Sequence, residues 1–404
     1  MSEMSNQIPD RPGRVSANIR SMLCYRWFGA RYSANNGQRD AESERQRDEH
    51  MKFGWLTLNH SPSAAEDGVA IDEQLQQACL AEALGYDSVW LTEHNFTGES
   101  VYGDPIPFAS ALAMKTERIR IGFAVIQMAL RHPVRVATQL SVVDNLCKGR
   151  LDVGVGRGTI FNEYEFVGYG LDSSDSRERF AESLEIMQRA WTKAPFDYQG
   201  KYYKLSIPEL RPMPHQRPHP PIWHSAISPS SFEHCGRQGV PVMTVRLGDG
   251  VLKERLGLYE VALRESGLSE QRQAELRKDA AVWRYVHVAE SDAQAEDELV
   301  DALRHTRQHM VHARQTLNPP DFKVEDQFLN PWSDGCVDEE EALKFTLSTG
   351  AFYGTAKRVK EQLAALRDID VHHVLCQMSF GFMSHARITQ SMKLFGEQVI
   401  PPLR

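Results

Sequence analysis

The chain of 404 residues is long enough for one large barrel domain or for two domains of medium size. Hydrophobic residues make up 41% and charged residues 25% of it, which is typical of globular proteins that bury a sizeable core. The formal net charge of -8 argues against nucleic acid as the main partner, because nucleic-acid-binding domains usually carry a basic surface.

Residues 1–50 differ in composition from the rest of the chain. They are rich in Arg, Ser, Asn and Asp and show no sustained hydrophobic periodicity. Such a segment buries little surface, so we predict a disordered N-terminal extension. The domain itself is expected to cover residues 51–404, and Met51 is a possible functional start.

From Lys52 onward, apolar strand patterns alternate with amphipathic helix patterns. We predict eight strands, over residues 52–58, 87–91, 119–126, 151–155, 221–226, 240–245, 281–288 and 371–378. The main helices are predicted over residues 71–84, 108–115, 134–147, 176–192, 228–237, 252–266, 292–314, 356–366 and 386–399. Two stretches, residues 197–220 and 318–349, interrupt this rhythm and are predicted to be irregular; the second is a candidate lid.

Eight strand-helix units predict a parallel α/β fold, a (βα)8 TIM barrel with insertions. An open doubly wound sheet is the competing architecture. It usually carries a glycine-rich phosphate-binding turn after the first strand. Residues 59–63 read Asn-His-Ser-Pro-Ser at that point, so the barrel is favoured.

Cysteine spacing and hydropathy indicate in which cellular compartment the protein is expected. The six cysteines form no CxxC pair, which argues against a disulfide framework and a structural zinc site. No apolar run approaches the length of a membrane-spanning helix, and the N-terminus lacks a signal-peptide pattern. We therefore expect a cytoplasmic protein with free thiols, no membrane partner and no metal.

In a barrel of this kind, functional residues follow the strands at their carboxyl ends. His94 follows the second predicted strand, and imidazole titrates near neutral pH. A catalytic histidine and a structural histidine that caps a loop both stay open. The adjacent Glu93 either orients the imidazole or is solvated. After the third strand, the small Ala124 offers backbone against which a flat ring could lie, although a plain core strand is the alternative.

Three features predict a phosphate site on neighbouring units. Arg157 follows the fourth strand between Gly156 and Gly158, where backbone and guanidinium can both approach an anion. Arg177 opens the long helix that follows. Ser228 and Ser231 stand at the start of a helix, whose free N–H groups bind phosphate well. Each feature alone has an ordinary structural explanation, but their combination is specific.

From Met51 to the C-terminus, the chain resembles the α subunit of bacterial luciferase and its relatives among flavin-dependent monooxygenases. The resemblance rests on short motifs that keep their order: Met-Lys-Phe-Gly at 51–54, Glu-His-Asn-Phe at 93–96, His-Pro-Val-Arg at 132–135, Lys-Gly-Arg at 148–150, Arg-Gly at 157–158 and Ser-Met-Lys-Leu-Phe at 391–395.

The resemblance implies a two-component monooxygenase. Its cofactor would be FMN, delivered reduced by a separate NAD(P)H:flavin reductase, and it would oxygenate a small organic substrate with O2 through a C4a-(hydro)peroxyflavin. His94 falls on the family's catalytic histidine. Phosphate ligands of the family fall on residues of the predicted phosphate site, namely Arg157, Arg177, Ser228 and Ser231. The resemblance also implies a homodimer.

Two further family positions concern the flavin ring. Ala124 and Val125 fall on a non-proline cis peptide beneath it, and Gly156 falls where some luciferases have a cysteine near the reactive carbon.

The chain departs from the luciferases at three positions. Asn95 replaces a second histidine, Ile227 a glutamate near the flavin, and Arg246 an aromatic residue after the sixth strand. These changes put light emission and aldehyde specificity in doubt, but not flavin binding. Arg246 indicates either a polar or anionic substrate group or a salt bridge at the rim. Two alternatives stay open: an F420-dependent oxidoreductase of the same fold and a non-enzymatic flavin-binding protein.

Overall fold

Eight parallel strands close into a barrel in the computed structural model, which describes residues 50–404 except 59, 324–331 and 333–337. The strands follow one another around the barrel as β1 (Lys52–Thr57), β2 (Ser88–Leu91), β3 (Arg120–Phe123), β5 (Leu151–Gly156), β8 (Ile222–Ser225), β9 (Val242–Thr244), β10 (Ala281–Val288) and β12 (His373–Ser379). Pairing of β12 with β1 and of β10 with β9 completes the circle. The predicted (βα)8 barrel is confirmed. Of the expected extension, residues 1–50, only His50 lies among the described residues.

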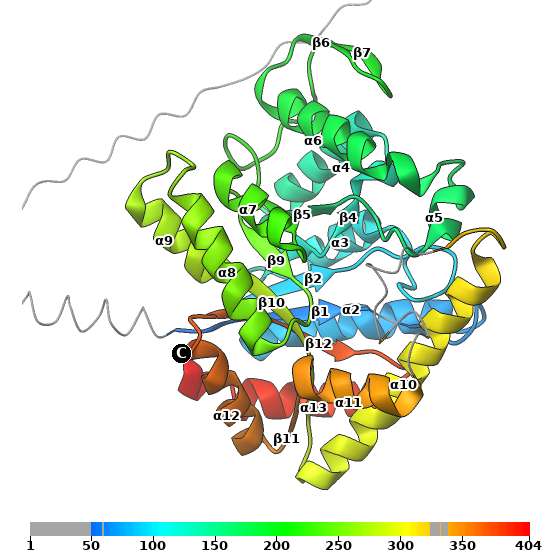
Figure 1. Cartoon of the computed structure of the whole chain (residues 1–404), viewed down its shortest axis with the longest axis vertical. Helices are drawn as coiled ribbons and strands as arrows, with labels where there is room; N and C mark the ends of the chain where they lie inside the picture. Colours follow the sequence, from blue (N-terminus) through cyan, green and yellow to red (C-terminus); the bar gives the residue numbers. More distant parts are fainter. Residues whose placement is uncertain (1–49, 59, 324–331, 333–337) are drawn as a thin grey trace, which may run out of the picture. The chain divides into compact units, whose positions relative to one another are not determined.

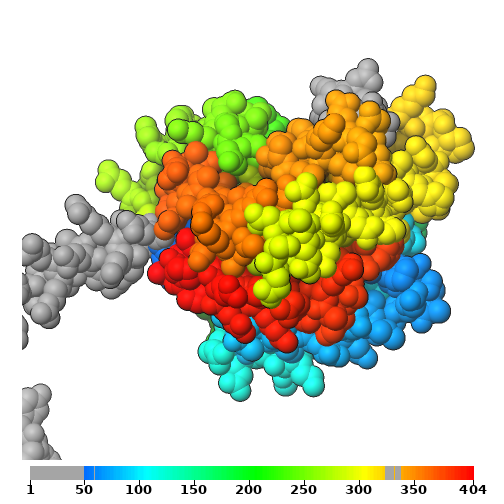
Figure 2. Space-filling model, turned by 90° about the horizontal axis from the view of Figure 1, so that it is seen from below, coloured from blue at the N-terminus to red at the C-terminus, as the bar shows by residue number. Residues whose placement is uncertain are grey.

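Helices surround the strands (Figure 1). The principal ones are α2 (Asp67–Ala83), α3 (Pro105–Lys115), α4 (Pro133–Leu146), α6 (Ser176–Thr192), α7 (Pro229–Gln238), α8 (Asp249–Leu263), α10 (Asp292–Leu317), α12 (Ala356–Arg367) and α13 (His385–Gln398). The last and first of them, α13 and α2, pack side by side, which joins the two ends of the domain (Figure 2). In the described part of the chain, no helix combines the length and apolarity needed to cross a membrane.

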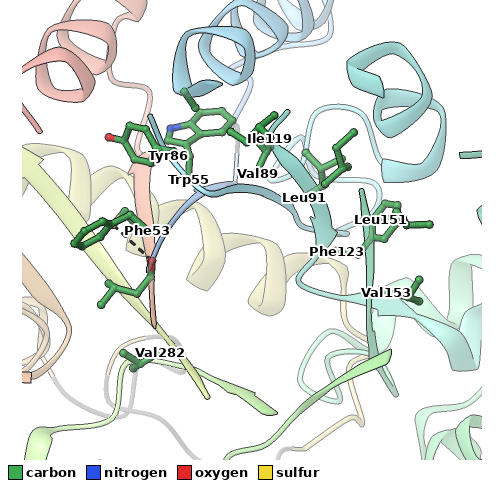
Figure 3. Close-up of a cluster of buried hydrophobic side chains, with 14 of the residues drawn as sticks. Phe53, Trp55, Tyr86, Val89, Leu91, Ile119, Phe123, Leu151, Val153 and Val282 are labelled. Carbon is green, nitrogen blue, oxygen red and sulfur yellow. Dashed lines mark hydrogen bonds between the residues drawn. The ribbon is translucent and has the colours of Figure 1, made fainter. Parts of the chain in front are cut away.

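Side chains alternate along the strands between a helix-facing and an interior layer. Figure 3 shows Trp55, Val89 and Val153 pointing away from the ring of strands, where they join the main core under the helices. The interior layer includes Trp90 and Trp223, whose rings meet edge to face with centroids 5.2 Å apart. Large side chains thus fill the barrel centre, so a ligand site must lie above it, at the mouth.

Glycine makes room for the Trp90 indole. A Cβ atom at Gly122 would lie 2.4 Å from the Trp90 ring, and one at Gly54 would lie 2.7 Å from it. Both distances are shorter than any tolerable contact between carbon atoms. The strand sequences therefore combine two large aromatic residues with small ones at the facing positions.

The prediction of an irregular stretch over residues 318–349 was wrong at its C-terminal end, where α11 (Glu339–Thr349) forms. Asp338 caps this helix by accepting a hydrogen bond from the Glu341 backbone N–H at 2.8 Å. The acidic run that suggested a polar loop is a helix N-terminus, where negative charge is favourable. The remaining lid residues lie largely outside the described residues.

Several shorter elements also differ from prediction. The stretch 197–220 contains part of an antiparallel hairpin of β6 (Phe196–Gln199) and β7 (Lys204–Ile207). The predicted single strand 119–126 is divided into β3 and β4 (Ile126–Gln127). Three unpredicted elements are α5 (Glu163–Gly168), α9 (Glu270–Asp279) and β11 (Ala351–Gly354), which extends the sheet beside β10. They are short, and their periodicity is too brief to stand out in a sequence.

Candidate functional site

The residues singled out in the sequence gather at the carboxyl ends of adjacent strands. His94 follows β2, Ala124 follows β3, and Arg157 follows β5. Strand β8 pairs with β5 so that His224 lies opposite Val155. This register brings the segment that leads to Ser228 beside Arg157 on the same edge of the barrel.

His94 lies between two buried carboxylates. Its Nδ1 is 3.3 Å from Glu165 Oε1, and its Nε2 is 3.8 Å from Glu99 Oε1. Burial lowers the pKa of His94, but the charges of Glu99 and Glu165 outweigh it and raise the pKa to about 9. His94 is therefore an imidazolium at neutral pH. Since 3.8 Å is too long for a hydrogen bond, the Nε2–H remains available to a bound group.

Glu165 is the centre of a hydrogen-bond network that the sequence did not reveal. Besides His94, its carboxylate accepts hydrogen bonds from side-chain amides: Asn95 Nδ2 at 3.1 Å, Gln127 Nε2 at 2.8 Å and Asn162 Nδ2 at 2.7 Å. Burial raises the pKa of Glu165, but the hydrogen bond and charge of His94 and the hydrogen bonds from Asn162 and Asn95 bring the net pKa below the ordinary value. The network holds a charged carboxylate in the protein interior and fixes the imidazole against it.

Glu93 does not orient His94, so that interpretation was wrong, as was the alternative of a solvated carboxylate. The Glu93 side chain is buried and forms an ion pair with Arg131 at 2.8 Å, and Arg131 also contacts Asp104 at 3.1 Å. Glu93 also accepts a hydrogen bond from the Gln127 backbone N–H at 2.9 Å. Its neighbour His94 points elsewhere, toward Glu165 and Glu99.

The peptide bond between Ala124 and Val125 is cis, as the family resemblance implied. Both residues are half-buried and pack against the interior layer that contains Trp90 and Trp223. Gly156 lies against this segment, because a Cβ there would be 2.6 Å from Val125 Cγ2. These three residues form a contiguous surface of backbone and small side chains at the mouth.

Arg157 and Arg177 lie close enough to influence each other. Burial and the Arg177 charge together lower the pKa of Arg157. Within the described ranges, neither guanidinium forms a salt bridge with a carboxylate. Two neighbouring cations without an anion between them form a positive site that favours an anionic ligand.

Hydroxyl groups gather at the N-terminus of α7. Ser228 is the N-cap residue and accepts a hydrogen bond from the Ser231 backbone N–H at 3.3 Å. The Ser231 hydroxyl lies 3.2 Å from that of Ser228. Phe180 lies in the second turn of α6, and its ring centroid is 6.1 Å from that of His224. This contact places the start of α6, and with it Arg177, near the end of β8.

The three positions that depart from the luciferases have distinct surroundings. Asn95 is buried and links Glu165 to the Tyr169 hydroxyl, which donates to Asn95 Oδ1 at 3.0 Å. Ile227 is 52% exposed and precedes the serine cluster. Arg246 forms no salt bridge with a carboxylate in the described part of the chain, so the rim salt bridge is not found there.

His60, at the end of β1, is a second buried imidazole close to His94. Its Nδ1 accepts a hydrogen bond from the Gly381 backbone N–H at 3.0 Å, which leaves the proton on Nε2. Burial and the nearby His309 and His94 lower the pKa of His60 to about 3. Adjacent strand ends thus present one neutral and one cationic imidazole.

Among the described residues, no group of three potential ligands is arranged to hold a metal ion.

Comparison with known proteins agrees with this geometry. The family profile described as luciferase-like monooxygenase matches residues 51–373. The alkanal monooxygenase alpha chain of the Kryptophanaron alfredi symbiont is 25% identical over 88% of this chain and 99% of its own length. The oxygenase component of the flavin-dependent trigonelline monooxygenase of Acinetobacter baylyi is 28% identical over 56% of this chain and 61% of its own.

A solved structure is similar over almost the whole described domain. Monooxygenase RslO1 from Streptomyces bottropensis superposes with a TM-score of 0.75 at 25% identity and covers 88% of this chain and 100% of its own.

Proposed function

The chain belongs to the luciferase-like monooxygenase family, and we propose that it is the oxygenase component of a two-component system that uses reduced FMN and O2 to oxygenate a small organic substrate. The observation that carries the proposal is the Arg157–Arg177 pair beside the serine-rich start of α7. Two cations without a carboxylate partner and a helix N-terminus suit a phosphate monoester such as that of FMN.

The other residues at the mouth fit the rest of such a cofactor. Ala124, Val125 and Gly156 present a surface without large side chains, against which a planar ring can lie. When bound, reduced FMN supplies the two electrons that activate O2. A separate flavin reductase would provide the reduced FMN. The similar trigonelline enzyme is likewise the oxygenase component of a flavin-dependent monooxygenase.

His94 would act as a hydrogen-bond donor and proton source. Glu165 holds the Nδ1 side of the imidazolium, and the Nε2–H is free to stabilise negative charge that develops during oxygen activation. Because the pKa of His94 is about 9, His94 serves as an acid at neutral pH and does not begin as a base. A positioned acid of this kind typically contributes roughly 10²- to 10⁴-fold to a rate.

Two measurements test the proposal. Titration of the purified protein with FMN and with F420 should give tighter binding of FMN; tighter binding of F420 would favour the F420-dependent oxidoreductase.

Oxygen consumption and hydrogen peroxide release should then be followed with FMN, NADH and an added flavin reductase, with a panel of substrates. We expect His94→Ala to lower substrate oxygenation roughly 10²- to 10⁴-fold while FMN still binds. Unchanged oxygenation would overturn the role of His94, and no oxygenation by the unmodified protein would leave a flavin-binding protein.

A further inference from the structure

Arg246 is stacked on aromatic rings at the barrel mouth. Its guanidinium carbon lies 4.4 Å from the centroid of the Trp283 ring, 4.7 Å from that of Tyr285 and 5.8 Å from that of Trp332. Arg246 stands two residues beyond the end of β9, and Thr244 pairs with Val282 of β10. Aromatic stacking orients a guanidinium without neutralising it, so the positive charge of Arg246 persists.

The rings in contact with Arg246 face the inside of the barrel. Trp283 and Tyr285 share a strand face with Ala281, which belongs to the interior layer around Trp90 and Trp223. Tyr285 also lies near Glu99, whose carboxylate faces His94 Nε2. Arg246 therefore lies at the same mouth as the proposed catalytic histidine, across the barrel from β2 and two strands around from Arg157.

Two hydrogen-bond donors in this cluster lack an acceptor. Arg246 Nη1 and Trp283 Nε1 are both buried without a partner among the described residues. The neighbouring Arg284 also has one buried nitrogen without a partner, its Nε, but it has a carboxylate partner, because its Nη2 lies 3.3 Å from Asp249 Oδ1 and 2.7 Å from the Leu247 carbonyl oxygen. Buried donors without acceptors are rare in folded proteins, because each costs roughly 1–3 kcal/mol.

Arg246 is also held from behind. A Cβ atom at Gly350 would lie 2.9 Å from Arg246 Cβ and 3.0 Å from its Cδ, so the chain packs closely against the stem of this side chain. Backbone on one side and rings on the other leave the guanidinium little freedom. A preorganised arginine of this kind favours bidentate contact with a planar carboxylate.

We propose that the substrate carries a carboxylate, which binds Arg246 with Trp283 Nε1 as a second donor and thereby directs the rest of the molecule toward His94. This inference rests on the proposed function, because it places the substrate at the same mouth as FMN. A small organic anion would satisfy both unpaired donors and neutralise the charge of Arg246. An uncharged carbonyl group would accept these hydrogen bonds but would leave the charge of Arg246 without a counter-charge.

The test is a binding measurement with matched probes. Benzoate and benzamide, and hexanoate and hexanamide, differ in charge but hardly in shape. Calorimetric titration of the unmodified protein should give at least about tenfold tighter binding of each acid than of its amide. Arg246→Gln should abolish this preference, Arg246→Lys should retain part of it, and Trp283→Phe, which keeps a ring but removes the N–H, should reduce it. Equal affinities of acid and amide in the unmodified protein would overturn the inference.

Two further variants separate binding from folding. Gly350→Ala leaves the charge in place but crowds Arg246, so it should lower the preference for acids without abolishing it. Arg264→Gln removes an arginine from an exposed helix pair and should leave the preference unchanged. Retention of the full preference by Arg246→Gln would contradict the proposed contact.

Titration of the same samples with oxidised FMN distinguishes this inference from the proposed function. If FMN fails to bind the unmodified protein while acids are still preferred, the proposed function fails and the carboxylate site stands. If FMN binds normally but acids are not preferred, only the carboxylate site fails. If Arg246→Gln weakens FMN binding as much as benzoate binding, Arg246 serves the flavin and not the substrate.

Discussion

The two sides of the barrel mouth treat charge in opposite ways. On the His94 side, an imidazolium lies between two carboxylates, and one of these carboxylates also accepts hydrogen bonds from several amides. On the Arg157 side, two guanidiniums lie close enough to influence each other and have no carboxylate partner among the described residues. The first arrangement keeps its geometry without a ligand, whereas the second gains a counter-charge only when an anion arrives. Under the proposed function, chemistry and cofactor binding would therefore lie on different walls.

The largest effect is expected on the side that awaits an anion. Removing both Arg157 and Arg177 by substitution with alanine should weaken oxidised FMN binding by roughly 10²-fold or more, since each charge-assisted hydrogen bond contributes about 1.5–3 kcal/mol. Riboflavin, which lacks the phosphate, should bind the variant as it binds the unmodified protein. Fluorescence titration with both ligands measures the difference. An equal loss of riboflavin affinity would show that Arg157 and Arg177 do not bind the phosphate.

On the His94 side, disruption of the hydrogen-bond network should lower the stability of the fold. Glu165→Ala leaves His94, Asn95 and Gln127 without their shared acceptor, and we expect it to lower the free energy of unfolding by about 3 kcal/mol. Urea denaturation measures this loss. Glu260→Ala, on an exposed face of α8, is the matched control and should change stability little. A loss no larger than that of the control would show that the network around Glu165 adds nothing to folding.

The same side should show a characteristic pH dependence. The pKa of His94 is raised in the folded protein from 6.5 to about 9. Its charge therefore stabilises the fold fully below pH 6.5, and this contribution disappears as the pH rises through about 9. The difference in unfolding free energy between the unmodified protein and His94→Gln should shrink across this range. Titration of His94 by NMR gives the pKa directly, and a value near 6.5 would contradict the carboxylate pairing.

The sequence predicted the two sides unequally, for physical reasons. Arg157 directly follows β5 and Ser228 lies three residues beyond the end of β8, so the barrel pattern alone places them at the mouth. Glu165 stands 71 residues from His94 on the short helix α5, and no local spacing connects them. Glu93, the adjacent carboxylate, was the natural but wrong choice, because its side chain pairs with Arg131 instead. The acidic run before Ala342 has the composition of a loop, although with Asp338 as cap it begins a helix.

The smallest effect concerns the boundary between the two sides, where Gly156 packs against Val125. Adding a methyl group by Gly156→Ala places a Cβ 2.6 Å from Val125 Cγ2, so Val125 must shift. We expect FMN affinity to fall by about fivefold, on the order of 1 kcal/mol, because the surface under the ring changes while the phosphate site does not. Riboflavin affinity should fall equally, unlike in the arginine variants. Val125→Ala shortens the opposing side chain, so the double variant should recover most of the affinity, and the coupling in this cycle measures the contact. If Gly156→Ala weakened the binding of FMN but not that of riboflavin, Gly156 would belong to the phosphate site. The proposed boundary between the two sides of the mouth would then be wrong.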